Sequence, residues 1–109
     1  VRAFESGRSA KIPQSLLGAV PCLMRSAEAR FGVAPVVTED TSLWIVRITL
    51  DLPRSADGGA QVRYELRSVD GKTTNVRYRV EAPPIRARAL EVEAFDPVER
   101  CAGTRDNRR

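Results

Sequence analysis

The chain has 109 residues, a hydrophobic fraction of 42% and a formal net charge of +4. This length fits one domain, and the chain is too apolar to be disordered. Its most apolar run, Leu43 to Leu52, carries two charged residues and is too short to cross a bilayer, so no transmembrane segment is expected. The chain has no histidine and therefore lacks the commonest general base and metal ligand.

The N-terminal part is predicted to be a flexible arm followed by a helix. Residues 1–11 show no hydrophobic periodicity, and a single domain is expected over residues 12–101. From about Pro13 to Phe31, apolar residues recur every three or four positions, and Gly32 follows as a C-terminal cap. Pro21 interrupts this helix, which is therefore either kinked or split; the split, with a second helix starting at Pro21, is preferred.

The middle of the chain has the pattern of an antiparallel sheet. Hydrophobic and charged residues alternate with period two over residues 43–52, 61–68 and 74–80, as in strands with one face buried and one in water. Residues 33–38 are expected to form a short edge strand. Pro53 is predicted to end the first long strand, and residues 54–60 to form a loop.

The apolar residues of the predicted hairpin all have even numbers, and Trp44 has the same inward parity. A three-residue loop at residues 69–71 keeps both apolar rows on one face, because a shift by one residue would turn one row into water. This register pairs Tyr64 with Val76 and places Arg63 opposite Arg77.

Residues 86–95 are predicted to form a last strand, with Leu90 inward and a bulge near Ala89. Residues 102–109 are expected to be a disordered tail. The predicted fold class is therefore α+β. An N-terminal helix, kinked or split at Pro21, packs on an antiparallel meander of three or four strands in two layers.

The two cysteines, Cys22 and Cys101, favour a disulfide and an oxidising compartment, with two buried thiols in a cytosolic protein as the alternative. A disulfide would join the helix to the end of the chain. The chain begins at Val1 rather than Met, which leaves room for a removed leader.

Catalysis has little support in the sequence. Nucleophile, phosphate-loop and dinucleotide motifs are absent, and no cofactor or metal site is expected. Glu91 and Glu93 would lie about 7 Å apart on one strand face, but a solvated face explains them better. Cys22 would be a reactive thiol if a helix began at Pro21, an interpretation ranked below a structural cysteine.

The outward face of the sheet is the best binding candidate. Its residues point to solvent by parity, and five of them are arginines: Arg47, Arg63, Arg67, Arg77 and Arg79. Glu65 and Glu81 share this face and can balance opposed arginines diagonally. A soluble Arg/Glu surface is the simpler interpretation, and an anion-binding surface is the functional one. Because the aromatic residues have inward parity, a base-stacking nucleic-acid surface is less favoured.

A helix with Cys22-Leu23 and a terminal Gly32, then an alternating meander and Cys101, resembles small exported envelope proteins and lipoproteins of proteobacteria. The resemblance implies that the two cysteines join helix to sheet, and it implies a periplasmic or secreted location. The layout is also similar to small lipoproteins of the outer-membrane assembly machinery, whose Gly-Met-Thr motif is absent here.

Three functions remain open after the sequence. The first is an exported, disulfide-stapled, non-enzymatic domain that binds another protein or an envelope component, either free or anchored to the membrane through a removed leader. The second is a basic cytoplasmic module that binds nucleic acid or another polyanion through its arginine face. The third, ranked lowest, is an enzyme or thiol-redox protein that uses Cys22.

Overall fold

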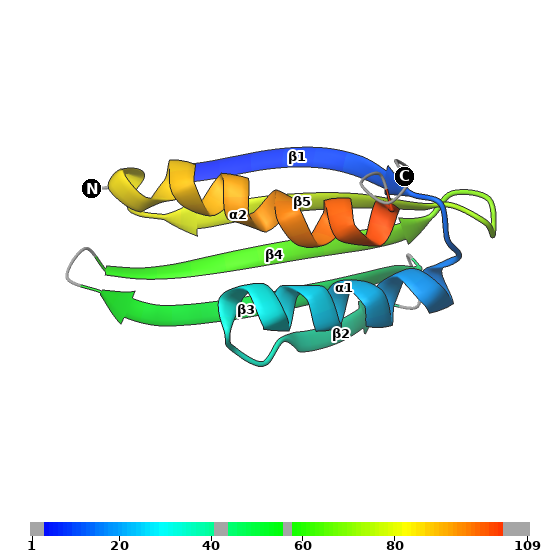
Figure 1. Cartoon of the computed structure of the whole chain (residues 1–109), viewed down its shortest axis with the longest axis horizontal. Helices are drawn as coiled ribbons and strands as arrows, with labels where there is room; N and C mark the ends of the chain where they lie inside the picture. The colour runs from blue at the N-terminus through cyan, green and yellow to red at the C-terminus, as the bar shows by residue number, and fades with distance from the viewer. Residues whose placement is uncertain (1–3, 41–43, 56–57, 104–109) are drawn as a thin grey trace.

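The computed structural model describes residues 4–40, 44–55 and 58–103, and Figure 1 shows their arrangement. One five-stranded antiparallel sheet, in the order β1-β5-β4-β3-β2, carries two helices. The elements in chain order are β1 (Phe4–Ile12), α1 (Leu16–Phe31), β2 (Val36–Asp40), β3 (Ile45–Ser55), β4 (Gly58–Ser68), β5 (Thr74–Ala82) and α2 (Pro84–Ala102). The predicted α+β fold with a helix on an antiparallel sheet is confirmed, with more strands than expected.

Strand β1 corrects the prediction of a flexible arm over residues 1–11. Its nine residues pair antiparallel with β5, from Phe4 opposite Ala82 to Ile12 opposite Thr74. This pairing gives hydrogen-bond partners to the second edge of β5. Most residues of β1 are small or polar, so its sequence shows no period-two alternation of hydrophobic and charged residues. Pairing with β5 is what makes this segment a strand. Residues 1–3 lie outside the described part of the chain.

Helix α1 is continuous through Pro21, so the preferred split is wrong. Gly32 caps the helix as predicted, with a φ of 73° and its N–H donating to the carbonyl of Glu28. Pro21 has no N–H to donate to the carbonyl of Leu17, one turn earlier. The helix tolerates this loss because Ala19 and Leu23, on either side of the proline, are fully buried.

The predicted last strand is wrong, because residues 86–95 belong to helix α2. Pro83 and Pro84 stop β5 as expected, and Pro84 then occupies the first turn of the helix, where a missing N–H costs nothing. The buried apolar residues follow helical steps of three and four: Ala87, Leu90, Ala94, Val98 and Cys101. The bulge expected near Ala89 is therefore absent. Ala102 ends this helix, and residues 104–109 of the predicted tail lie outside the described residues.

The hairpin of β4 and β5 has the predicted parity but a different register. Tyr64 faces Tyr78 rather than Val76, and Ser68 faces Thr74. The connecting loop is therefore five residues long, and the N–H of Val69 donates to the carbonyl of Thr73 at 2.8 Å. The buried Thr74 explains the shift, because its hydroxyl donates to the carbonyl of Gln14 at 2.9 Å and holds that residue inside the strand.

Both ends of β3 differ from the prediction. The strand continues beyond Pro53 to Ser55, with an irregular register after Leu52, and β4 already begins at Gly58. Trp44 precedes the strand with a φ of 55°, and its exposed fraction is 73%, so it is not an inward residue. The expected edge strand is present as β2, slightly later in the chain than residues 33–38.

The two helices lie side by side on one face of the sheet (Figure 1). Helix α2 packs on β1 and β5, and α1 packs on β4 and β3. Between them and the sheet, Tyr64 is fully buried and its hydroxyl donates to the carbonyl of Ala94 at 2.7 Å. Within the described residues, neither helix is long and apolar enough to cross a membrane.

A disulfide between Cys22 and Cys101 joins α1 to α2, as the even cysteine pair favoured. It therefore links helix to helix, whereas the resemblance to envelope proteins implied a link from helix to sheet. The side-chain amide of Gln14 donates to the carbonyl of Cys101 at 3.0 Å. The turn before α1 is thus attached to the end of α2.

We expect Tyr64→Phe to weaken the fold and to change how its stability depends on pH. Burial, followed by the nearby groups of Tyr78 and Asp96, raises the pKa of the Tyr64 hydroxyl above its ordinary value of 10.0. Above about pH 10, the unfolded chain loses a proton that the folded chain keeps, so the free energy of unfolding falls as pH rises. Below that pH this contribution is constant.

At pH 7 the Tyr64→Phe variant should lose about 1 kcal/mol of unfolding free energy, because the buried hydrogen bond to Ala94 is gone. Above about pH 10, its stability should fall less steeply than that of the wild type. Urea denaturation at a series of pH values measures both effects. An unchanged alkaline slope in Tyr64→Phe would contradict the expectation.

Removing the disulfide should cost a large part of the stability. The cysteines are separated by 79 positions, and the chain-entropy model gives about 4.5 kcal/mol for a cross-link of that span. The Cys22→Ala/Cys101→Ala variant should therefore unfold at a much lower urea concentration. The reduced wild type lacks the cross-link but keeps both cysteine side chains, so it should lose about the same stability as the double variant. A loss of less than about 1 kcal/mol would show that the bridge adds little.

Candidate functional site

The face of the sheet opposite the helices carries all five predicted arginines. They come from three adjacent strands: Arg47 on β3, Arg63 and Arg67 on β4, and Arg77 and Arg79 on β5. Apart from Ser68, the even-numbered neighbours of these residues are buried on the helix side of the sheet, so the period-two alternation directs the guanidinium groups to solvent. Use of this face for binding remains a prediction.

Four of the five arginines line one shallow groove of about 270 Å³: Arg47, Arg63, Arg77 and Arg79. Glu65 also lines it, and the strands at Tyr64 and Tyr78 form its floor. Arg67 is exposed on the same face but does not line the groove. We call this the arginine groove. Among the described residues that line it, Glu65 is the one carboxylate.

Two cross-strand ion pairs balance part of this positive charge. The Nε atom of Arg47 lies 3.3 Å from Glu65 Oε2, and the two residues face each other across β3 and β4. In the observed register Arg63 faces Arg79, and not Arg77 as predicted. Like charges in direct opposition are unfavourable. Glu81 offsets them diagonally, with its Oε1 atom 3.2 Å from Arg63 Nη2, in the role predicted for it.

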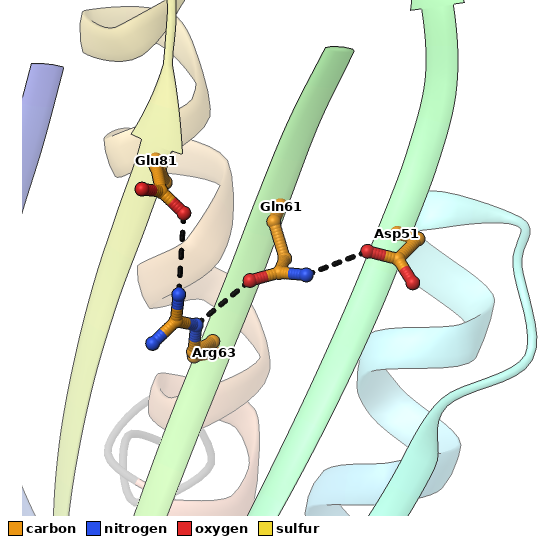
Figure 2. Close-up of polar contacts among 4 residues, drawn as sticks. All are labelled: Asp51, Gln61, Arg63 and Glu81. Carbon is orange, nitrogen blue, oxygen red and sulfur yellow. Dashed lines mark hydrogen bonds and ion pairs between the residues drawn. The ribbon is translucent and has the colours of Figure 1, made fainter. Parts of the chain in front are cut away.

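A chain of hydrogen bonds orients Arg63 (Figure 2). The amide of Gln61 donates to Asp51 Oδ1 at 2.7 Å and accepts from Arg63 Nε at 2.8 Å. With the contact to Glu81, this network crosses β3, β4 and β5. Sequence reasoning missed Asp51 and Gln61, although both share the outward parity of Arg63. A guanidinium that is already oriented loses less conformational entropy when it binds an anion.

These ion pairs are exposed enough to exchange partners. The side chains of Arg63 and Glu81 are 42% and 43% exposed, and those of Arg47 and Glu65 are 43% and 30% exposed. Exposed pairs of this kind contribute between zero and about 1 kcal/mol. An incoming carboxylate or phosphate can therefore take a guanidinium from Glu65 or Glu81 at small cost to the fold.

The tyrosines do not present their rings in the groove. The hydroxyl of Tyr64 reaches α2 on the other side of the sheet, and the ring of Tyr78 lies 6.1 Å from that of Tyr64 and 6.0 Å from that of Phe95. Inward parity for both tyrosines is thus correct. The residues lining the groove supply charge and backbone, without the exposed rings that stack nucleic-acid bases.

The other sequence candidates do not form a site. Cys22 is in the disulfide, so it is not a reactive thiol in this state. Glu91 and Glu93 are two positions apart on a helix and therefore point in different directions; Glu91 pairs with Arg8 at 3.2 Å. Across the part of the chain that the structure describes, no group of three or more His, Cys, Asp or Glu side chains could hold a metal ion.

No protein-family model and no curated protein matches the sequence. The fold itself has clear structural neighbours. Ara h 8.0201 superposes with a TM-score of 0.61 at 8% identity, over 94% of this chain and 97% of that one. The ZhuI aromatase/cyclase from Streptomyces sp. R1128 gives 0.58 at 10% identity, over 97% and 95% of the two chains. The chain therefore shares the overall α+β fold of these two proteins, and identities this low show the fold alone.

Proposed function

We propose that this chain is an exported, disulfide-stapled domain without catalytic activity, and that its arginine groove binds an acidic segment of a partner protein or envelope component. The observation that carries the proposal is the convergence of four arginines from three neighbouring strands on one groove. Arg77 and Arg79, two residues apart on β5, present guanidinium groups at a spacing of about 7 Å. Every second carboxylate of an extended acidic chain lies on one face and has a similar spacing.

The chemistry of the groove favours carboxylates. A guanidinium is planar and binds a carboxylate through two parallel hydrogen bonds, which a lysine cannot do. The groove already contains one such acceptor, because Glu65 contacts Arg47. An acidic partner would extend this arrangement to Arg77 and Arg79, which also line the groove. Electrostatic attraction of this kind raises the association rate and weakens with salt.

Nucleic acid or another polyanion is the alternative ligand for the same face. It has less support because Tyr64 and Tyr78 direct their rings to the helix side, leaving phosphate contacts as the main source of affinity. The non-enzymatic assignment is supported by the absence of histidine and by the bonded state of Cys22. One structural neighbour is an aromatase/cyclase, but its low identity carries no activity to this chain.

Binding should be strongest for an acidic peptide and should depend on the groove. We expect a fluorescent deca-glutamate peptide to bind in low salt, with an affinity that falls as salt rises. The triple variant Arg63→Gln/Arg77→Gln/Arg79→Gln should bind about tenfold or more weakly. The variant Glu65→Gln should bind more tightly, because it removes the competing carboxylate. Fluorescence anisotropy measures all three.

A matched control removes the same charge elsewhere. Arg25→Gln/Arg30→Gln/Arg88→Gln takes three exposed arginines from the helices, and it should keep most of the peptide affinity. An equal loss in both triple variants would mean that net charge alone drives binding and would overturn the groove. Tighter binding of a single-stranded DNA oligomer of equal charge would favour the polyanion alternative. Urea denaturation checks that each variant is folded.

An exported protein should have Cys22 and Cys101 joined as a disulfide in the cells that produce it. Protein recovered after alkylation of free thiols at lysis should carry no alkyl group and should have the mass of the dithiol form less two hydrogens. Disulfides persist in oxidising compartments, whereas cytosolic thiols stay reduced. A doubly alkylated protein would instead indicate the cytoplasm and would support the second hypothesis from the sequence.

A further inference from the structure

A second concave surface lies on the helix side of the sheet, away from the arginine groove. It is an apolar hollow of about 350 Å³ between the start of α1, the end of β2 and the start of β3. Most of the residues that line it are hydrophobic, and two are acidic: Leu16, Leu17, Val20, Pro21, Glu39, Asp40, Trp44, Ile45 and Val46. We call it the apolar hollow.

Two large apolar side chains stand exposed at this hollow. Leu17 is 89% exposed on a helix whose buried face lies elsewhere, and Trp44 is 73% exposed. Trp44 also has a φ of 55°, and it is the one non-glycine residue with a positive φ among the described residues. This conformation is unfavourable for a bulky residue, and such strain clusters at binding and switch sites. Tryptophan is also one of the residue types enriched among the side chains that dominate binding at the centres of protein interfaces.

The hollow lies where the helix layer ends. Helix α2 packs on β1 and β5, and α1 packs on β4 and β3. The two helices together therefore cover four of the five strands. Strand β2 lies at the edge of the sheet beside β3 (Figure 1). Glu39 of β2 faces the inward residue Val46 and is exposed on that side. Strand β2 thus packs little against either helix.

The acidic residues at the rim of the apolar hollow favour a positively charged partner. Glu39 and Asp40 are the charged residues among the described residues lining the hollow. The carbonyl of Leu17, one turn before Pro21, lacks its usual helical donor because proline has no N–H. An apolar centre with an acidic border fits a ligand that has an apolar face bordered by lysine or arginine.

We propose that the apolar hollow binds a basic amphipathic helix of a partner protein. The helix lies beside α1, places its apolar face on Leu17 and Trp44, and directs its cationic residues to Glu39. This binding mode uses apolar anchors at helical spacing in a groove. It is independent of the arginine groove, which lies on the opposite face of the sheet and requires the opposite charge.

The fluorescence of Trp44 reports directly on the hollow, because the chain has a single tryptophan. The probes are three peptides of about 18 residues without aromatic residues: Leu/Lys with helical period, Leu/Lys with strict alternation, and Leu/Glu with helical period. Titration with the first should shift the Trp44 emission to the blue and protect it from acrylamide. The Leu/Glu peptide should have no such effect.

Two variants and a control locate the contact. Leu17→Gln should weaken binding of the helical Leu/Lys peptide about tenfold or more, and Glu39→Gln should weaken it about threefold. Val92→Gln removes another strongly exposed apolar residue, on α2, where Val92 is 73% exposed, and should change binding less than about twofold. The arginine-groove triple variant should bind this peptide as the wild type does.

Four outcomes would overturn the proposal. These are no emission change, equal effects of Leu17→Gln and Val92→Gln, equal binding of the Leu/Glu peptide, and tighter binding of the alternating peptide. The last would indicate strand addition at the free edge of β2. Because Leu17 is exposed, its replacement should leave the urea denaturation curve almost unchanged, which separates lost binding from lost folding.

Discussion

The packing of two helices on one face of the sheet determines the character of every other surface. Side chains alternate across a strand, so covering one face leaves the residues between the buried ones in water. In β4, Val62, Tyr64 and Leu66 are fully buried, while Arg63 lies on the solvent side. The arginine groove is thus a direct consequence of where the hydrophobic core lies.

The molecule presents two concave surfaces with opposite chemistry. The uncovered sheet face carries oriented guanidinium groups around a groove, with Glu65 and Glu81 as exchangeable counter-charges. The helix side carries an apolar hollow with an acidic rim, between the start of α1, the end of β2 and the start of β3. Because the surfaces lie on opposite sides of the sheet, occupation of one does not obstruct the other. The two proposed ligands would therefore not compete for the same face of the sheet.

The interior shows how a small chain stabilises this arrangement. The buried Tyr64 hydroxyl connects the middle of the sheet to α2, and the disulfide connects α2 to α1. Gln14 connects the turn before α1 to both β5 and the end of α2. Each helix is thus attached to the sheet or to the other helix by a specific bond in addition to apolar packing, which alone is weakly directional.

Local pattern was sufficient for features that depend on neighbouring residues. Period-two alternation gave the three long strands and the outward parity of the five arginines, and a glycine at the end of a helical stripe gave the Gly32 cap. The even number of cysteines favoured the disulfide. Four of the five arginines then proved to line one groove, whereas Asp51 and Gln61 passed unnoticed as ordinary polar residues.

The remaining features depend on contacts between distant parts of the chain, so only the tertiary structure decided them. Strand β1 exists because β5 offers it an edge, and the hairpin register follows from a bond between Thr74 and Gln14. In α2, Leu90 and Ala94 fit both a strand and a helix, and the contacts of Val98 and Cys101 with the core select the helix. Trp44 has inward parity, but it precedes β3 in a backbone conformation that alternation does not describe. Pairing and packing energies act through space, whereas sequence patterns describe one segment at a time.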